Sequence, residues 1–131
     1  MNTIVNPTCL ARPSGYSHGI LVEPGRGLLA LAGQVAWDRN DRIVSDDFAE
    51  QFEQALANLL AVVAAAGGAP ESVVKITLFV TNKSEYIASV KNVGERYRRL
   101  MGTHYPAMTL VEVKALLEAG AKIEIEGLAA I

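Results

Sequence analysis

The feature that most constrains this chain is a pair of amphipathic helical patterns on either side of one β-branched stretch. In the first pattern, residues 48–63, apolar side chains recur at helical spacing and polar ones take the other side. The apolar positions are Phe48, Phe52, Leu56, Leu59 and Val63, and the polar ones Glu50, Gln51, Glu53 and Gln54. Residues 73–80, mostly apolar, predict a central strand. Two such helices can cover only one face of a sheet, which favours a two-layer α+β domain.

Capping residues set the expected limits of both helices. The first helix should begin after a capping box of Asp47 and Glu50 and end at Gly67–Gly68. The second should begin after a capping box of Asn82 and Glu85 and end at Gly102. The second helix should present an apolar face made of Ile87, Val90, Gly94, Tyr97 and Met101.

Shorter stretches complete the order of elements. Residues 105–113 and 122–129 predict strands, and in the second of them Ile123 and Ile125 point one way while Glu124 and Glu126 point the other. Residues 19–23 and 28–32 flank a Pro-Gly-Arg-Gly turn and predict a hairpin, and residues 3–5 are a candidate edge strand. The expected order is β-β-α-β-α-β-β in one domain, residues 1–131, with both helices on one face of a mixed sheet.

Composition limits the classes of function. The chain has 131 residues, 50% of them hydrophobic, enough for one core, and its net charge of −2 argues against binding nucleic acid. One cysteine and two histidines argue against a disulfide scaffold and a zinc site. The sequence contains no phosphate-binding or dinucleotide-binding motif, so it implies no cofactor. No signal peptide or membrane-spanning run is visible, so we expect a cytoplasmic protein.

Four segments together resemble a known family. Pro-Ser-Gly-Tyr-Ser-His-Gly at 13–19, Leu-Ala-Gly-Gln-Val at 31–35, the 73–80 strand, and the Tyr-Pro-Ala-Met and Ile-Glu-Ile-Glu strands at 105–113 and 122–129 occur in order and at the right spacing. In these segments the chain resembles the Rid proteins (reactive intermediate deaminases, YjgF-like). The resemblance covers nearly the whole chain. It implies a chorismate-mutase-like fold, a homotrimer, a small-molecule substrate and active sites in clefts between subunits.

The resemblance also implies site residues. Glu124 would position the attacking water, Tyr16 would line the cleft, and Gly33 and Gln34 would shape its floor. His18 is a further candidate for contact with substrate, although a half-exposed loop histidine is its simpler interpretation. Read from strand alternation alone, Glu124 would lie on a solvated face.

Met108 departs from the family pattern. It stands where active imino-acid deaminases carry an arginine, whose planar fork holds the substrate carboxylate. Methionine is uncharged and donates no hydrogen bond. Ala32 likewise stands where many members have serine. We therefore expect weak or absent activity on ordinary 2-imino acids, unless Arg12 or Lys114 supplies the missing cation.

Other motifs have structural interpretations. Residues 15–19 match Gly-x-Ser-x-Gly, but a nucleophile elbow at Ser17 requires a preceding strand and a following helix. Cys9 has no visible activating histidine, and Trp37 is interpreted as a packing residue. The basic cluster Arg96, Arg98 and Arg99 is interpreted as a complement to the helix dipole.

The sequence is compatible with three functions. The first is a Rid hydrolase that deaminates an imine or enamine with an atypical substrate. The second is a non-catalytic Rid protein that binds a metabolite in the cleft, which Met108 and Ala32 favour. The third is a pathway-specific deaminase of the aminomuconate type.

Overall fold

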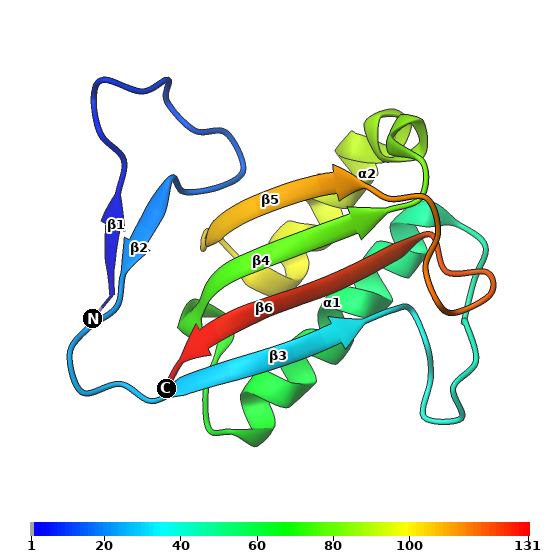
Figure 1. The fold of residues 1–131 in the computed structure, drawn as a ribbon, viewed down its shortest axis with the longest axis horizontal. Helices are drawn as coiled ribbons and strands as arrows, with labels where there is room; N and C mark the ends of the chain where they lie inside the picture. The colour runs from blue at the N-terminus through cyan, green and yellow to red at the C-terminus, as the bar shows by residue number, and fades with distance from the viewer. Residues whose placement is uncertain (1) are drawn as a thin grey trace.

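A computed structural model of the protein describes residues 2–131 (Figure 1). The strands are β1 (Thr3–Val5), β2 (Gly19–Leu21), β3 (Leu28–Gln34), β4 (Val73–Val80), β5 (Ala107–Glu112) and β6 (Ile123–Ala130). The helices are α1 (Phe48–Ala65), α2 (Lys83–Met101) and the short 3-10 helix η1 (Pro70–Ser72). The predicted helices and central strand are confirmed, and residues 3–5 do form a strand.

The main sheet has the strand order β3-β6-β4-β5. The β4–β5 pair is parallel, whereas β6 runs antiparallel to both β3 and β4, so the sheet is mixed. Both long helices lie behind this sheet, and its other face is left without a covering layer (Figure 1). The predicted two-layer α+β class is confirmed, with one face of the sheet uncovered in the single chain.

The predicted hairpin between residues 19–23 and 28–32 is wrong. β2 pairs with β1 in a separate two-stranded sheet, and β3 pairs with β6 instead (Figure 1). The physical reason is a long-range contact just before β2. Ser17 forms a bridge with Ala107, and its backbone N–H donates to Pro106 O at 3.1 Å, which holds this segment near β5, at the edge of the sheet opposite β3.

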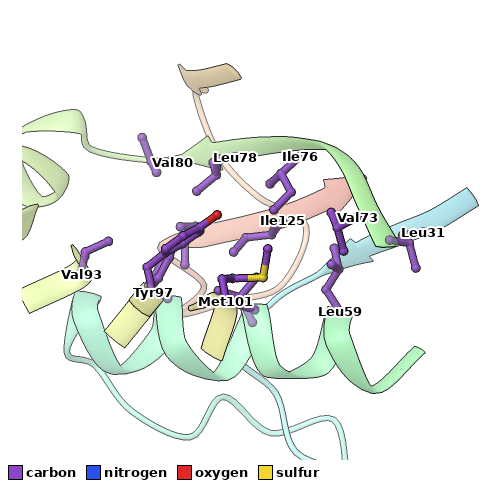
Figure 2. Close-up of a cluster of buried hydrophobic side chains, with 14 of the residues drawn as sticks. Leu31, Leu59, Val73, Ile76, Leu78, Val80, Val93, Tyr97, Met101 and Ile125 are labelled. Carbon is purple, nitrogen blue, oxygen red and sulfur yellow. The ribbon is translucent and has the colours of Figure 1, made fainter. Parts of the chain in front are cut away.

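The core lies between the sheet and the two helices. The buried side chains of β4, Ile76, Leu78 and Val80, alternate with half-buried ones on the other face. Figure 2 shows Ile76 and Leu78 pointing toward the helices and Met101 of α2 pointing back toward the sheet. This packing fixes which face each strand residue occupies.

The apolar face of α2 differs from the prediction. Its buried residues are Val93, Tyr97 and Met101, whereas Ile87 is 63% exposed and Val90 is 52% exposed. The first half of α2 therefore leaves apolar side chains uncovered in the single chain. Asn82 caps α2 by accepting from Ser84 N, but Glu85 forms an ion pair with Lys122 instead of completing a capping box.

Gln51 was predicted on the polar side of α1 but is fully buried. Its amide group donates to Ser45 O at 2.7 Å and Gly120 O at 2.9 Å, and its carbonyl accepts from Lys122 N. The side chain thus satisfies backbone groups on both sides of α1, in the segments before α1 and before β6. It thereby fixes the start of β6, the strand that carries Glu124.

Candidate functional site

Two clusters of candidate residues lie on opposite faces of the sheet. On the helix-covered face, Met108 pairs with buried Ile76 across the β4–β5 ladder and packs against the core. On the open face, Glu124 pairs with Phe79, while its neighbour Ile125 is buried toward the helices. Because side chains alternate along a strand, Met108 and Glu124 of one chain point to opposite sides.

The helix-covered face contains a pocket of about 460 Å³. Its walls come from the sheet, the two helices and the segment around Tyr16, and Met108 lies in the sheet wall. Most of the lining is apolar or aromatic: Tyr16, Phe52, Leu56, Ile76, Leu78, Tyr86, Val90, Val93, Tyr97, Tyr105, Met108, Leu110 and Ile125. Such volume and chemistry are typical of small-molecule sites.

Tyr16 reaches this pocket because Ser17 is fixed beside β5. The Ser17 hydroxyl donates to Tyr105 O, and the side chain is buried. Residue 16 is thereby placed at the pocket edge, where its ring meets that of His18 edge-on at 5.3 Å between centroids. His18 itself does not line the pocket, and its ring nitrogen Nε2 bonds to Ala11 O at 2.8 Å.

Two further tyrosines form the pocket's end. Tyr97 and Tyr105 stack with their ring centroids 5.2 Å apart, and the Tyr97 hydroxyl donates to His104 O at 2.6 Å. Burial raises the pKa of Tyr97 above its usual value, and the neighbouring Tyr105 adds to the effect. Tyr97 therefore remains a neutral hydrogen-bond donor near neutral pH.

On the open face, the Glu124 carboxylate lies directly over the backbone of Gly33. A Cβ added at Gly33 would come within 2.3 Å of Glu124 Oε1, closer than any real contact allows. The carboxylate is half-buried and makes no side-chain hydrogen bond or ion pair with residues 2–131. The missing side chain at Gly33 thus leaves space for the Glu124 carboxylate.

The residues beside Gly33 take different positions. Ala32 is exposed on the open side of β3. The side-chain oxygen of Gln34 accepts from the Trp37 ring nitrogen Nε1 at 3.3 Å, which orients that amide. Trp37 therefore has a definite role in positioning Gln34, beyond packing alone.

Neither candidate for the missing cation lines the pocket. Arg12 lines a separate groove beside the N-terminal segment, and Lys114 is exposed in the loop after β5. The one cationic side chain among the pocket's lining residues is Arg98 of α2. Arg98 was not among the site residues predicted from the sequence, although it follows Gly94, on the predicted apolar face, by one helical turn.

The nucleophile-elbow interpretation does not fit the structure. Ser17 is buried and followed by β2 rather than by a helix. Within residues 2–131 no group of histidine, cysteine and carboxylate side chains could hold a metal ion. None of the helices described for this chain has the length and apolarity to cross a membrane. The candidate site consists of the pocket on the helix-covered face and the Glu124 carboxylate on the open face.

Comparison with known proteins identifies the family. The family model described as Endoribonuclease L-PSP matches residues 9–131. A Yersinia pestis protein of the conserved Rid family is 33% identical, with a TM-score of 0.86 over 99% of this chain and 98% of that one. The chain belongs to the Rid (YjgF-like) family.

Two further Rid relatives have names that bear on chemistry. The Salmonella typhimurium protein named 2-iminobutanoate/2-iminopropanoate deaminase is 34% identical over 102 residues, 78% of each chain. The human protein of the same name is 31% identical over 115 residues, 87% of this chain and 78% of its own. Imine deamination is thus an activity attributed to relatives of this Rid chain.

Proposed function

We propose that this Rid protein is a hydrolytic imine or enamine deaminase whose site is completed between two subunits of a homotrimer. The observation that carries the proposal is the placement of Met108 and Glu124 on opposite faces of one sheet. None of the pocket's lining residues has a carboxylate, and Glu124 lies outside the pocket. A site with both a pocket and a general base therefore needs two protomers.

The open face offers the surface through which protomers would meet. It leaves Leu128 37% exposed and Val111 39% exposed, and Phe79 is half-buried beside Glu124. Apolar side chains on an uncovered sheet face favour association. Packing this face against the pocket side of a neighbour would bring Glu124 to the pocket that Tyr16 and Met108 line.

The proposed chemistry needs one carboxylate and one water. Glu124 takes a proton from the water while the water oxygen attacks the C=N carbon. The proton then passes to the imine nitrogen. The resulting carbinolamine breaks its C–N bond to give a carbonyl compound and ammonia. An enamine first takes a proton on carbon to become the imine. The named deaminase relatives support this reaction class.

The test compares Glu124→Gln with Glu126→Gln, a matched control two residues along the same face. Imines are generated in situ from a panel of amines and amino acids by amine and amino-acid oxidases, and the initial rate of ammonia release is measured. Glu124→Gln should lower the catalysed rate at least about 100-fold, because it removes the general base. Glu126→Gln should retain activity. The proposal would be refuted if wild type and Glu124→Gln released ammonia at equal rates from every imine whose hydrolysis the wild type accelerates.

The second candidate is a metabolite-binding Rid protein without turnover. Met108, which cannot hold a carboxylate, and Ala32, exposed where many members have serine, favour it. This candidate predicts ligand binding in the pocket with no acceleration of ammonia release for any imine in the panel.

A further inference from the structure

Arg98 is the pocket residue that the proposed reaction does not yet use. It lies on α2, and its guanidinium group folds back over Gly94, one turn earlier in the helix. A Cβ at Gly94 would lie 3.3 Å from Arg98 Nη1, so the absence of a side chain there lets the guanidinium lie close to the helix. Gly94 and Arg98 both line the pocket.

Among residues 2–131 the neighbouring arginines have side-chain partners, and Arg98 has none. Arg96 and Arg99 form ion pairs with Glu53 of α1, at 3.5 Å and 3.1 Å. In the described chain, residues 2–131, Arg98 makes no ion pair or side-chain hydrogen bond. Its guanidinium also points back along the helix, away from the last carbonyls, so the helix dipole does not account for its position.

The rest of the pocket explains what such a cation could bind. Met108 and Leu110 line the sheet wall without a hydrogen-bond donor, while Val90, Tyr86 and Arg98 come from the helix wall. A ligand that fills this volume has an apolar or aromatic body against the sheet. Its anionic group would meet a cation only on the α2 side, since Arg98 is the one cationic residue of the lining and a carboxylate left against Met108 would be desolvated without a partner.

We infer that Arg98 is the anion-binding residue of this pocket, and that the substrate is an imine or enamine with an aromatic or branched apolar body and an anionic group set apart from the C=N carbon. The inference rests on the proposed deaminase function for the substrate's reacting group. The anion-binding role itself rests only on the pocket, and a planar guanidinium suits a carboxylate bidentately. The anion would thus be bound from α2, whereas the family pattern places its arginine at position 108 on β5.

Calorimetric titration of the full-length protein tests this role with two probes. Hydrocinnamate and hydrocinnamamide share a phenyl ring and spacer and differ in charge. Each is titrated into wild type, Arg98→Gln and Arg99→Gln, the last being a matched control whose side chain pairs with Glu53 outside the pocket. Both substitutions are on an exposed helix surface, where they should leave the fold intact.

Wild type should bind the acid about three- to ten-fold more tightly than the amide, because the acid gains a charge-assisted hydrogen bond. Arg98→Gln should abolish this preference, and Arg99→Gln should keep it. Equal binding of the two probes to wild type, binding of neither, or a preference that survives in Arg98→Gln would overturn the inference.

Failure of the proposed reaction would appear separately. If Glu124→Gln leaves ammonia release unchanged while the acid preference still depends on Arg98, the deaminase mechanism is wrong and the anion site stands. If Glu124→Gln abolishes turnover while Arg98→Gln leaves the acid preference unchanged, the deaminase mechanism stands and the anion site at Arg98 is wrong.

Discussion

Met108 and Glu124 point to opposite faces of one sheet, although they lie on its two C-terminal strands. β4 lies between those strands, and its buried residues Ile76 and Leu78 pair with Met108 and Ile125. Ile125 takes the helix-covered face, so Glu124 takes the open one. One chain therefore carries the pocket and the carboxylate on opposite surfaces, and the proposed reaction would need a second copy to bring them together.

Gly33→Ala should displace the Glu124 carboxylate while leaving the fold intact. The new methyl would clash with the Oε1 and Cδ atoms of Glu124, and the flexible end of that side chain can move aside. We expect kcat to fall roughly 10- to 100-fold through misplacement of the base. Gly27→Ala, where the added Cβ would make only an ordinary contact 3.5 Å from Ile131 O, is the control. Unchanged kcat in Gly33→Ala would show that the position of Glu124 over Gly33 is irrelevant to activity.

Met108→Arg should create activity on small 2-imino acids. Their carboxylate is their main handle, and Met108 cannot pair with it. With 2-iminobutyrate generated by an amino-acid oxidase and trapped by semicarbazide, wild type should change the trapped product little. Met108→Arg should increase the deaminase effect roughly ten-fold, through a bidentate contact. Wild-type activity equal to that of the Salmonella relative would contradict our interpretation of Met108.

How far the sequence predicts this protein depends on how local each signal is. The α1 and α2 periodicities and the β4 pattern are local, so the helices and the layer arrangement were predictable. The pairing of β2 was not, because it depends on Ser17 contacting Tyr105, 88 residues away. The buried state of Gln51 was hidden for the same reason, since its partners lie in distant loops.

The site was predictable in part. Alternation in β6 separates Glu124 from Ile125, and the apolar pair Met108 and Leu110 already marks the covered face of β5. Reading both patterns together would have shown that the two site residues face apart. The orientation of the Arg98 guanidinium could not be predicted, because it depends on the space above Gly94 and on the pairing of Glu53 with Arg96 and Arg99.

Gln51→Leu should destabilise the fold strongly for a change at one polar side chain. It would leave Ser45 O, Gly120 O and Lys122 N without the partner that now reaches them from a fully buried side chain. We expect the free energy of unfolding to fall by about 2–4 kcal/mol, measured by urea denaturation. Gln54→Leu, which removes only one bond to Asn58 on the same helix, should cost far less. Similar losses in both variants would refute the role of Gln51.

Stability should fall at alkaline pH through Tyr97. Its folded pKa is raised above the ordinary value of 10.0, so the folded chain keeps a proton that the unfolded chain loses. The unfolding free energy therefore falls as pH rises beyond that ordinary value, by at most about 1.4 kcal/mol per pH unit from this group. Tyr97→Phe should remove that part of the slope and cost about 1 kcal/mol near neutral pH. Identical slopes in both proteins above pH 10 would exclude Tyr97 as the cause.

Complementation between two inactive variants tests the shared site most directly. Glu124→Gln keeps the pocket and loses the base, whereas Val90→Trp places a large ring at the exposed pocket edge and keeps the base. The two are mixed, unfolded and refolded together, and ammonia release is compared with that of each variant refolded alone. If each site joins two protomers, about a quarter of the sites in randomly mixed trimers combine an intact pocket with an intact Glu124. Activity should then return to about that fraction of the wild-type rate. A mixture that remains as inactive as its two components, with trimers verified by light scattering, would contradict a site formed between subunits.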